Sequence, residues 1–196
     1  MAKADNAPRR RGAARGRLLD AAARRFYADG IAATGIDTIT ADAGVAKMSL
    51  YNNFDSKADL VEAYLEARHE EWLGLYADRA RAASGSRALI GAVFDAYLDH
   101  AELAYESGFR GCGLLNAAAE LPAGHPARAL VRRHKDDVEE ILRAHLSGLV
   151  DADRVDSLAR HFSFLLEGSM ALAGLAGDGR KLEEAKRLAL GLIDAL

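Results

Sequence analysis

The chain has 196 residues, half of them hydrophobic and 28% charged, which fits one or two globular domains with a buried core. No apolar run approaches the roughly 20 residues that cross a bilayer, and the basic N-terminus lacks the apolar region of a secretory signal, so we expect a cytoplasmic protein without a membrane partner. The net charge of −3 hides an asymmetry, because residues 1–60 carry +3 and the remainder carries −6.

Few prolines, few β-branched runs and many alanines, leucines, arginines and glutamates predict an all-α protein. Residues 1–14 combine an arginine run with no periodicity, which predicts a flexible basic arm that neutralises DNA phosphates, or a solubilising tail. Glycine, proline and capping residues then delimit the predicted helices. These are 15–29, 36–43, 47–54, 57–83, 87–107, 114–121, 126–149, 153–176 and 181–196.

Residues 34–60 carry the most specific signal. An amphipathic stretch containing Ile36 and Ile39 meets a tight turn at Gly44, and a second stretch containing Leu50 and Phe54 follows at once. This spacing packs two short helices at a steep angle. The second helix has a polar face made of Lys47, Ser49, Asn52 and Asn53. Such a face suits the DNA major groove, so residues 15–56 are predicted to form a helix-turn-helix DNA-binding domain.

Residues 57–196 are predicted to form a ligand-binding and dimerisation domain. The last two helices, 153–176 and 181–196, are too apolar for a single buried face, which favours a homodimer built as a four-helix bundle. The alternative is that helix 153–176 simply lies at the centre of the monomer.

Aromatic and aliphatic side chains at helical spacing in the same domain are typical of an amphipathic ligand pocket, or of plain core packing. The candidate ligand-binding residues are Trp72, Tyr76, Phe94, Tyr97, Tyr105, Phe109, Cys112, Asn116, Phe162 and Leu166. Because few charges are expected among them, the sequence predicts an uncharged or weakly polar organic effector.

Other chemistry finds little support in the sequence. The six histidines show no compact metal-ligand spacing, and no phosphate-cradling loop, nucleophile elbow or catalytic carboxylate pair is present, so we expect no metal, no cofactor and no enzymatic activity. Cys112 excludes an intramolecular disulfide framework. It is either packing or, beside Arg110, a reactive thiol, which leaves a thiol- or metal-sensing regulator as an alternative.

The segment LLDAAARRFYADGIAATGIDTITADAGVAKMSLYNNFDSKADLV resembles the N-terminal domain of the TetR/AcrR (tetracycline-repressor) family. The segment GCGLLNAAAELPAGHPAR is similar, less specifically, to the core domain of some members. The resemblance implies a homodimer with two DNA-binding domains and a mostly apolar pocket in each C-terminal domain. An effector changes the separation of the two DNA-binding domains and releases a palindromic operator, and most members are repressors.

The resemblance also implies roles for individual residues. The expected DNA-binding residues are Thr34, Thr38, Lys47, Met48, Ser49, Tyr51, Asn52, Asn53 and Lys57. Lys47, Met48 and Ser49 open the recognition helix, Asn52 and Asn53 face the groove or flanking backbone, and the others contact phosphates. The chain departs from the family at Met48, where glycine is common, and at the two asparagines, where aromatic residues are frequent. Base preference therefore differs from that of other members.

Three hypotheses about function remain from the sequence. The first is a ligand-responsive transcriptional repressor. The second is a helical small-molecule carrier or enzyme with a basic N-terminus, which has no use for the polar-faced helix at residues 47–54. The third is a nonspecific nucleoid-type DNA binder, which the acidic C-terminal two-thirds disfavours.

Overall fold

The computed structural model describes residues 7–102 and 108–196, with side chains from residue 12 onward. Every regular element in these ranges is an α-helix, which confirms the predicted fold class. The helices are α1 (Ala7–Ala28), α2 (Ile36–Asp42), α3 (Lys47–Tyr51), α4 (Lys57–Ala82), α5 (Ser86–Glu102), α6 (Gly113–Glu120), α7 (Ala127–Leu146), α8 (Ala152–Ala176) and α9 (Arg180–Asp194).

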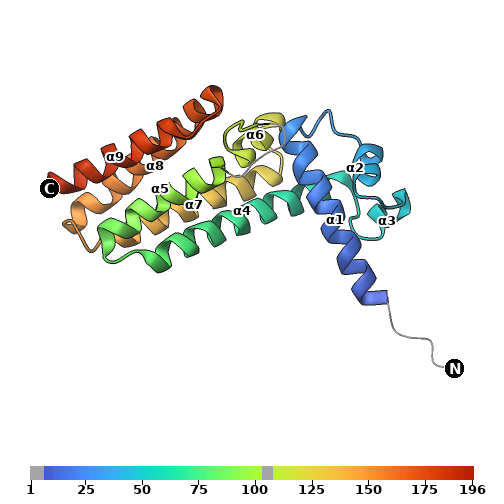
Figure 1. The fold of residues 1–196 in the computed structure, drawn as a ribbon, viewed down its shortest axis with the longest axis horizontal. Coiled ribbons are helices and arrows are strands. Elements are labelled where there is room, and N and C mark those ends of the chain that lie inside the picture. Colours follow the sequence, from blue (N-terminus) through green and yellow to red (C-terminus); the bar gives the residue numbers. More distant parts are fainter. Residues whose placement is uncertain (1–6, 103–107) are drawn as a thin grey trace.

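The molecule is elongated, with α1, α2 and α3 gathered at one end (Figure 1). We call these three helices the head. Helix α4 begins beside the head and continues along a bundle in which it packs on α5 and α7. Helices α8 and α9 pack on each other and form an outer layer over α5 and α7. Short α6 lies between this bundle and α1, so it bridges the head and the remaining helices.

Local sequence signals explain the helix ends that position the head. Gly30 follows α1 with a φ of +93°, in the left-handed region that favours glycine. Ser56 caps α4, because its hydroxyl accepts the N–H of Asp59 at 3.1 Å. Gly35 precedes α2 without any side-chain cap, as its lack of a side chain predicts.

Apart from the end of α5, three helix bounds differ from the predictions by three residues or more. Helix α1 begins at Ala7, so the expected flexible arm is wrong for residues 7–14, because arginine and alanine favour helix even without an apolar period. Residues 1–6 lie outside the described residues. Helix α3 ends at Tyr51 rather than 54, and α7 ends at Leu146, before Gly148. Of the predicted helix 87–107, residues 103–107 also lie outside the described part.

One continuous apolar core runs from the head into the bundle. In the head it buries Leu18, Ile39, Leu50 and Phe54, so Phe54 is a packing residue as its spacing indicates. None of the described helices combines the length and apolar character that a bilayer crossing requires.

Three histidines are buried in the bundle, namely His69, His100 and His134. The Nδ1 atoms of His69 and His134 lie 3.0 Å apart, so one imidazole donates and the other accepts. Burial, assisted by nearby cations such as Lys135, lowers the pKa of His134 to about 2. Burial likewise lowers the pKa of His100 to about 4, with Arg68 contributing. Both imidazoles are therefore neutral in the folded protein at neutral pH.

We expect the free energy of unfolding to fall as the pH falls from about 6.5 towards 4. In this window the unfolded chain binds protons on these imidazoles while the folded chain resists them, so stability is present above the unfolded pKa and is lost on acidification. Replacing His134 by Gln should reduce the slope near pH 5 by about 1.4 kcal/mol per pH unit.

Urea unfolding at closely spaced pH values measures this slope, which is independent of any constant loss of stability in the variant. His100→Gln should act in the same direction. A slope equal to that of the wild type in both variants would contradict the neutral, buried state of these histidines.

Candidate DNA-binding surface and polar interior

The head is held together by apolar packing and by ion pairs between its helices. Ile39 of α2 and Leu50 of α3 are fully buried in the core that also contains Leu18 and Phe26 of α1. The Arg25 guanidinium of α1 donates to the carboxylate of Asp42, with Nε 2.5 Å from Oδ2. Both α2 and α3 are thereby fixed on α1, and the opposite side of α3 is left to solvent.

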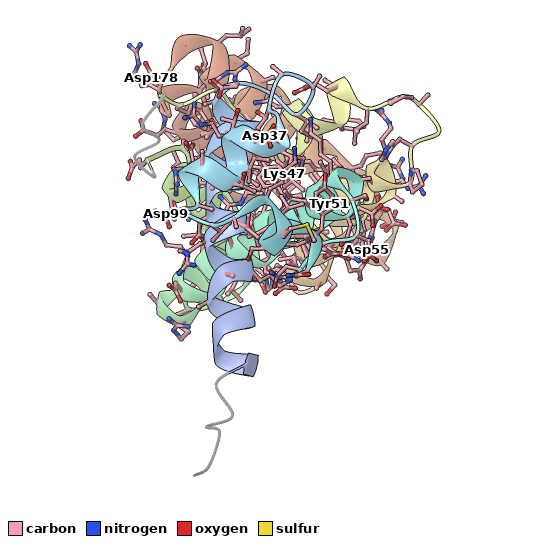
Figure 2. All side chains as sticks on the ribbon, turned by 90° about the vertical axis from the view of Figure 1, so that its right-hand side faces the viewer. Asp37, Lys47, Tyr51, Asp55, Asp99 and Asp178 are labelled. Carbon is pink, nitrogen blue, oxygen red and sulfur yellow. The ribbon has the colours of Figure 1, made fainter. Side chains whose placement is uncertain are left out.

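The exposed side of α3 lies at the end of the molecule (Figure 2). Met48 is 68% exposed and Tyr51 is 46% exposed, which is unusual for large apolar side chains unless they contact something else. Lys47 is also exposed, and its Nζ lies 2.8 Å from Oδ1 of Asp37 on α2. Asn52 is exposed at the end of α3. These side chains form a mixed apolar and polar surface.

The remaining predicted DNA-binding residues differ in position. Thr38 is exposed on α2, whereas Ser49 is half-buried. Asn53 is half-buried as well and donates from Nδ2 to the carbonyl of Ser49 at 2.6 Å. Thr34 is 3% exposed, and its hydroxyl donates to the carbonyl of Gly30 at 2.6 Å. The structure therefore corrects the expectation that the Thr34 hydroxyl faces DNA phosphates.

Lys57 has an internal partner that the sequence did not indicate. Its side chain is half-buried at the start of α4, and Nζ donates to the backbone carbonyl of Ile31 at 2.6 Å. This contact ties α4 to the loop between α1 and α2. Lys57 therefore fixes the loop between α1 and α2 relative to α4, in addition to the phosphate contact that the resemblance implies.

Most of the predicted ligand-binding residues are in the interior of the bundle. Trp72, Phe94, Tyr97, Cys112, Phe162 and Leu166 are buried. Tyr76, Phe109 and Asn116 are half-buried, and Tyr105 lies outside the described residues. The structure brings together Trp72, Tyr76 and Tyr97, with Trp72 stacked on Tyr76 and edge-on to Tyr97 at 5.5 Å between ring centroids.

A charged pair that sequence reasoning missed lies against this aromatic group. Nζ of Lys135 is 2.8 Å from Oε1 of Glu167, and the hydroxyl of Tyr97 donates to the same carboxylate oxygen at 3.2 Å. Lys135 also lies 3.6 Å from Sγ of Cys112. Burial opposes the charge of Lys135, but Cys112, Tyr97 and Glu167 outweigh it and raise its pKa, so the ammonium stays protonated.

Two neighbouring polar groups extend this polar interior. The indole N–H of Trp72 is buried and has no acceptor among the described residues, although such donors normally have one. Arg68 and Glu71 form a second partly buried ion pair, with Nη1 2.8 Å from Oε2. The expectation that few buried charges lie among the candidate ligand-binding residues is therefore wrong. The sequence did contain one indication of a buried charge, because Lys135 falls on the apolar stripe of α7 between Val131 and Val138.

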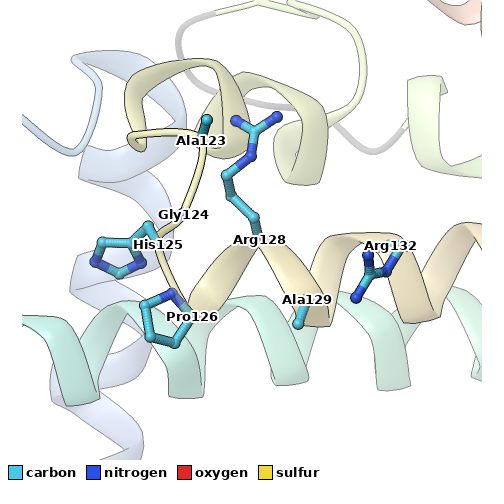
Figure 3. A pocket seen from close by; sticks show the side chains of 7 residues that line it. All are labelled: Ala123, Gly124, His125, Pro126, Arg128, Ala129 and Arg132. Atoms are coloured by element: carbon cyan, nitrogen blue, oxygen red, sulfur yellow. The ribbon is translucent and has the colours of Figure 1, made fainter.

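A separate hollow of about 390 Å³ lies beside the loop between α6 and α7, lined by Ala123, Gly124, His125, Pro126, Arg128, Ala129 and Arg132 (Figure 3). None of the predicted ligand-binding residues lines it. Arg128 reaches from α7 to α6, where it donates to the carbonyls of Ala118 and Leu121. Among the described residues, no group of three histidine, cysteine or carboxylate side chains is placed to hold a metal ion.

Comparison with known proteins assigns this arrangement to a family. A family model described as bacterial regulatory proteins, tetR family, matches residues 18–64, which include the second half of α1, all of α2 and α3, and the first part of α4. The solved structure of a TetR-family transcriptional regulator from Streptomyces coelicolor is 32% identical. It covers 94% of each chain with a TM-score of 0.80.

Two curated relatives match over a smaller part of the chain. The HTH-type transcriptional regulator TtgR of Pseudomonas putida is 41% identical over 56 residues, which span 29% of this chain and only 27% of TtgR. The HTH-type transcriptional repressor KstR2 of Rhodococcus jostii is 36% identical over 76 residues, or 39% of this chain and 37% of KstR2. With the likeness to the Streptomyces structure extending over nearly the whole chain, the protein belongs to the TetR family of DNA-binding transcriptional regulators and is not an enzyme.

Proposed function

We propose that the protein is a repressor that binds a palindromic operator as a homodimer and releases it when a small organic effector binds. The observation that carries the proposal is the exposed surface of α3, where Met48 and Tyr51 are held out to solvent by a well-packed head. The proposed DNA-binding domain comprises the head up to residue 56, and residues 57–196 form the effector-binding and dimerisation domain. The protein would act in the cytoplasm, where it meets chromosomal DNA.

The exposed side chains of the head suggest a division of labour on DNA. Asn52 and Met48 are free to face base edges, where asparagine pairs with adenine and an apolar group contacts a thymine methyl. Lys47, Thr38 and Tyr51 are placed to contact phosphates, which position the protein without reading sequence. Ser49 and Asn53 are secondary candidates because they are half-buried.

We expect genomic fragments selected by the protein to share an inverted repeat, because a two-fold dimer presents two copies of α3. On such a fragment, Asn52→Ala should weaken binding by about 1–3 kcal/mol and should leave binding to unrelated DNA unchanged. Fluorescence anisotropy with both duplexes measures the two affinities.

The matched control is Lys47→Ala, which removes a phosphate contact and should weaken both duplexes alike while reducing the salt dependence. Lys57→Ala is a poorer choice because it also removes the bond to Ile31. Selected fragments without any shared palindrome would refute the operator proposal.

The proposed dimer uses the outer layer formed by α8 and α9. Helix α8 buries Phe162, Leu166 and Met170 on one side but exposes large apolar side chains on the other. The exposed apolar residues of the two helices are Phe164, Leu172, Leu175, Leu188 and Leu192. A monomer rarely exposes so much apolar surface on adjacent helices, and a second copy that packs α8 and α9 on their equivalents would cover it.

We expect the wild-type protein to be a dimer at micromolar concentration. Replacing Leu188 and Leu192 together by Glu should convert it to a monomer, because unpaired charges in the interface cost several kcal/mol. Both side chains are exposed in the single chain, so the variant should keep its helical circular dichroism spectrum. Light scattering measures the mass, and a monomeric wild type would rule out this interface.

The proposed effector binds in the bundle beside Lys135, Glu167, Tyr97 and Trp72. A wholly apolar ligand would leave the indole N–H of Trp72 without an acceptor, whereas a ligand with a hydrogen-bond acceptor could satisfy it. We therefore propose an aromatic or aliphatic compound with acceptor groups rather than a hydrocarbon. It can release DNA only by binding the released state more tightly than the DNA-bound state.

We expect compounds found by a thermal-shift screen of such acceptor-bearing molecules to raise the melting temperature of the wild type and to weaken DNA binding. Tyr97→Phe keeps the ring but removes the hydroxyl that contacts Glu167, so it should reduce both effects. Each shift is measured against the unliganded melting temperature of the same variant, which separates ligand binding from folding.

Equal responses of the wild type and Tyr97→Phe would place the effector elsewhere. Release of DNA by a thiol reagent alone, abolished by Cys112→Ser, would replace the organic effector by a thiol sensor.

A further inference from the structure

Within residues 7–102 and 108–196, the head is joined to the bundle at two places, one of which is the covalent connection into α4. The second is the segment from Gly108 to Leu121, which leads into α6 and lies against the end of α1 (Figure 1). One attachment leaves a body free to pivot, whereas two attachments fix its angle. The polar contacts of this second attachment therefore bear on the angle between the head and the bundle.

Arg110 makes the first of these contacts. Its Nη1 donates to the carbonyl of Tyr27 at 2.7 Å and to that of Ala28, both in the last turn of α1. Its backbone N–H donates to the hydroxyl of Tyr27 at 2.6 Å, and that hydroxyl donates to the carbonyl of Gly111 at 3.1 Å. A cation at a helix C-terminus is stabilised both by these bonds and by the helix dipole.

Glu120, at the end of α6, makes the second contact. Its Oε1 accepts the N–H of Ile31 at 3.0 Å, and its Oε2 accepts the N–H of Ala32 at 2.7 Å. Hydrogen bonds to an ionised carboxylate are stronger than those between neutral groups. The carboxylate comes so close that a Cβ added at Gly30 would lie 2.8 Å from Oε1. The loop after α1 is thus shaped to receive this side chain.

The segment that carries both residues is itself fastened to the bundle. Within the segment, Asn116 of α6 donates from Nδ2 to the carbonyl of Arg110 at 3.0 Å and so ties Arg110 to α6. Arg128 of α7 donates to two carbonyls at the end of α6, as described above (Figure 3). Gly111 also packs against α8, where a Cβ added at Gly174 would lie 2.7 Å from the Cα of Gly111.

We propose that Arg110 and Glu120 are positioning residues for DNA binding, and that they form a bracket that sets the angle of the head on the bundle. Because the bracket is held by α7 and touches α8, a displacement of either helix is carried to the end of α1. The consequence for DNA rests on the proposed operator function, since the spacing of two heads in a dimer depends on the angle of each. The bracket itself is testable without DNA.

The test compares the wild type with the double variant Arg110→Ala/Glu120→Ala. Spin labels are attached to cysteines at Asp20 on α1 and Asp136 on α7, both exposed, in a Cys112→Ala background, and labelled chain is diluted with unlabelled chain. Pulsed electron–electron double resonance then gives the distribution of distances between the two labels, and hence between head and bundle, within one chain. We expect one narrow distribution for the wild type and a broadened distribution for the double variant.

Hydrogen exchange provides the second readout. The amides of Ile31 and Ala32 should exchange about tenfold faster in Glu120→Ala, because each loses a hydrogen bond to a charged acceptor. Glu120→Gln keeps one oxygen acceptor and is expected to fall between the wild type and Glu120→Ala. Glu120→Gln also tests the proposal if the double variant does not fold.

The matched control is Glu70→Ala/Arg132→Ala, which removes the same two charges from exposed positions on α4 and α7. This control should keep the narrow distribution and the slow exchange. The proposal is overturned if the double variant gives the wild-type distribution, if Glu120→Gln leaves both amides protected as in the wild type, or if the control broadens the distribution equally. Since no DNA is present, these outcomes are separate from failure of the operator proposal.

Discussion

A single residue, Ile31 in the loop between α1 and α2, is hydrogen-bonded through its backbone from two sides. Its N–H is accepted by Glu120 of α6, and its carbonyl accepts from Lys57 of α4. Both partners belong to helices that lead into the bundle, so the loop that begins the DNA-binding motif cannot move independently of either. Sequence-specific DNA binding by the exposed surface of α3 depends on this constraint. A recognition helix discriminates between DNA sequences only if its position is fixed.

The bundle beyond this point has an unusually polar interior for a domain of this size. Lys135 with Glu167, and Arg68 with Glu71, place charges where desolvation is costly, and such pairs add little stability compared with apolar packing. Their presence beside an indole N–H that lacks an acceptor is better understood as a recognition device than as part of a stabilising core. A polar interior also discriminates strongly, since a ligand without the matching groups leaves them unpaired.

Much of this organisation could be predicted from sequence, and the failures have physical reasons. Helical periodicity and glycine at the helix ends predicted the helix order, because these features depend on local interactions. Tertiary contacts decided the rest. Thr34 turns inward to Gly30, and the Lys135–Glu167 pair joins α7 to α8 across 32 positions of the chain, a pairing that no local pattern encodes.

In the proposed dimer, two heads held at a fixed spacing read two half-sites together. The most direct test compares a duplex carrying a selected inverted repeat with a duplex in which one half-site has been scrambled, using the same wild-type protein. We expect two chains to bind the intact duplex. The affinity for the intact duplex should be at least about a hundredfold higher than the affinity for the scrambled duplex, because the second contact is made at high effective concentration. Equal affinity for the two duplexes, or one chain on the intact repeat, would contradict this expectation.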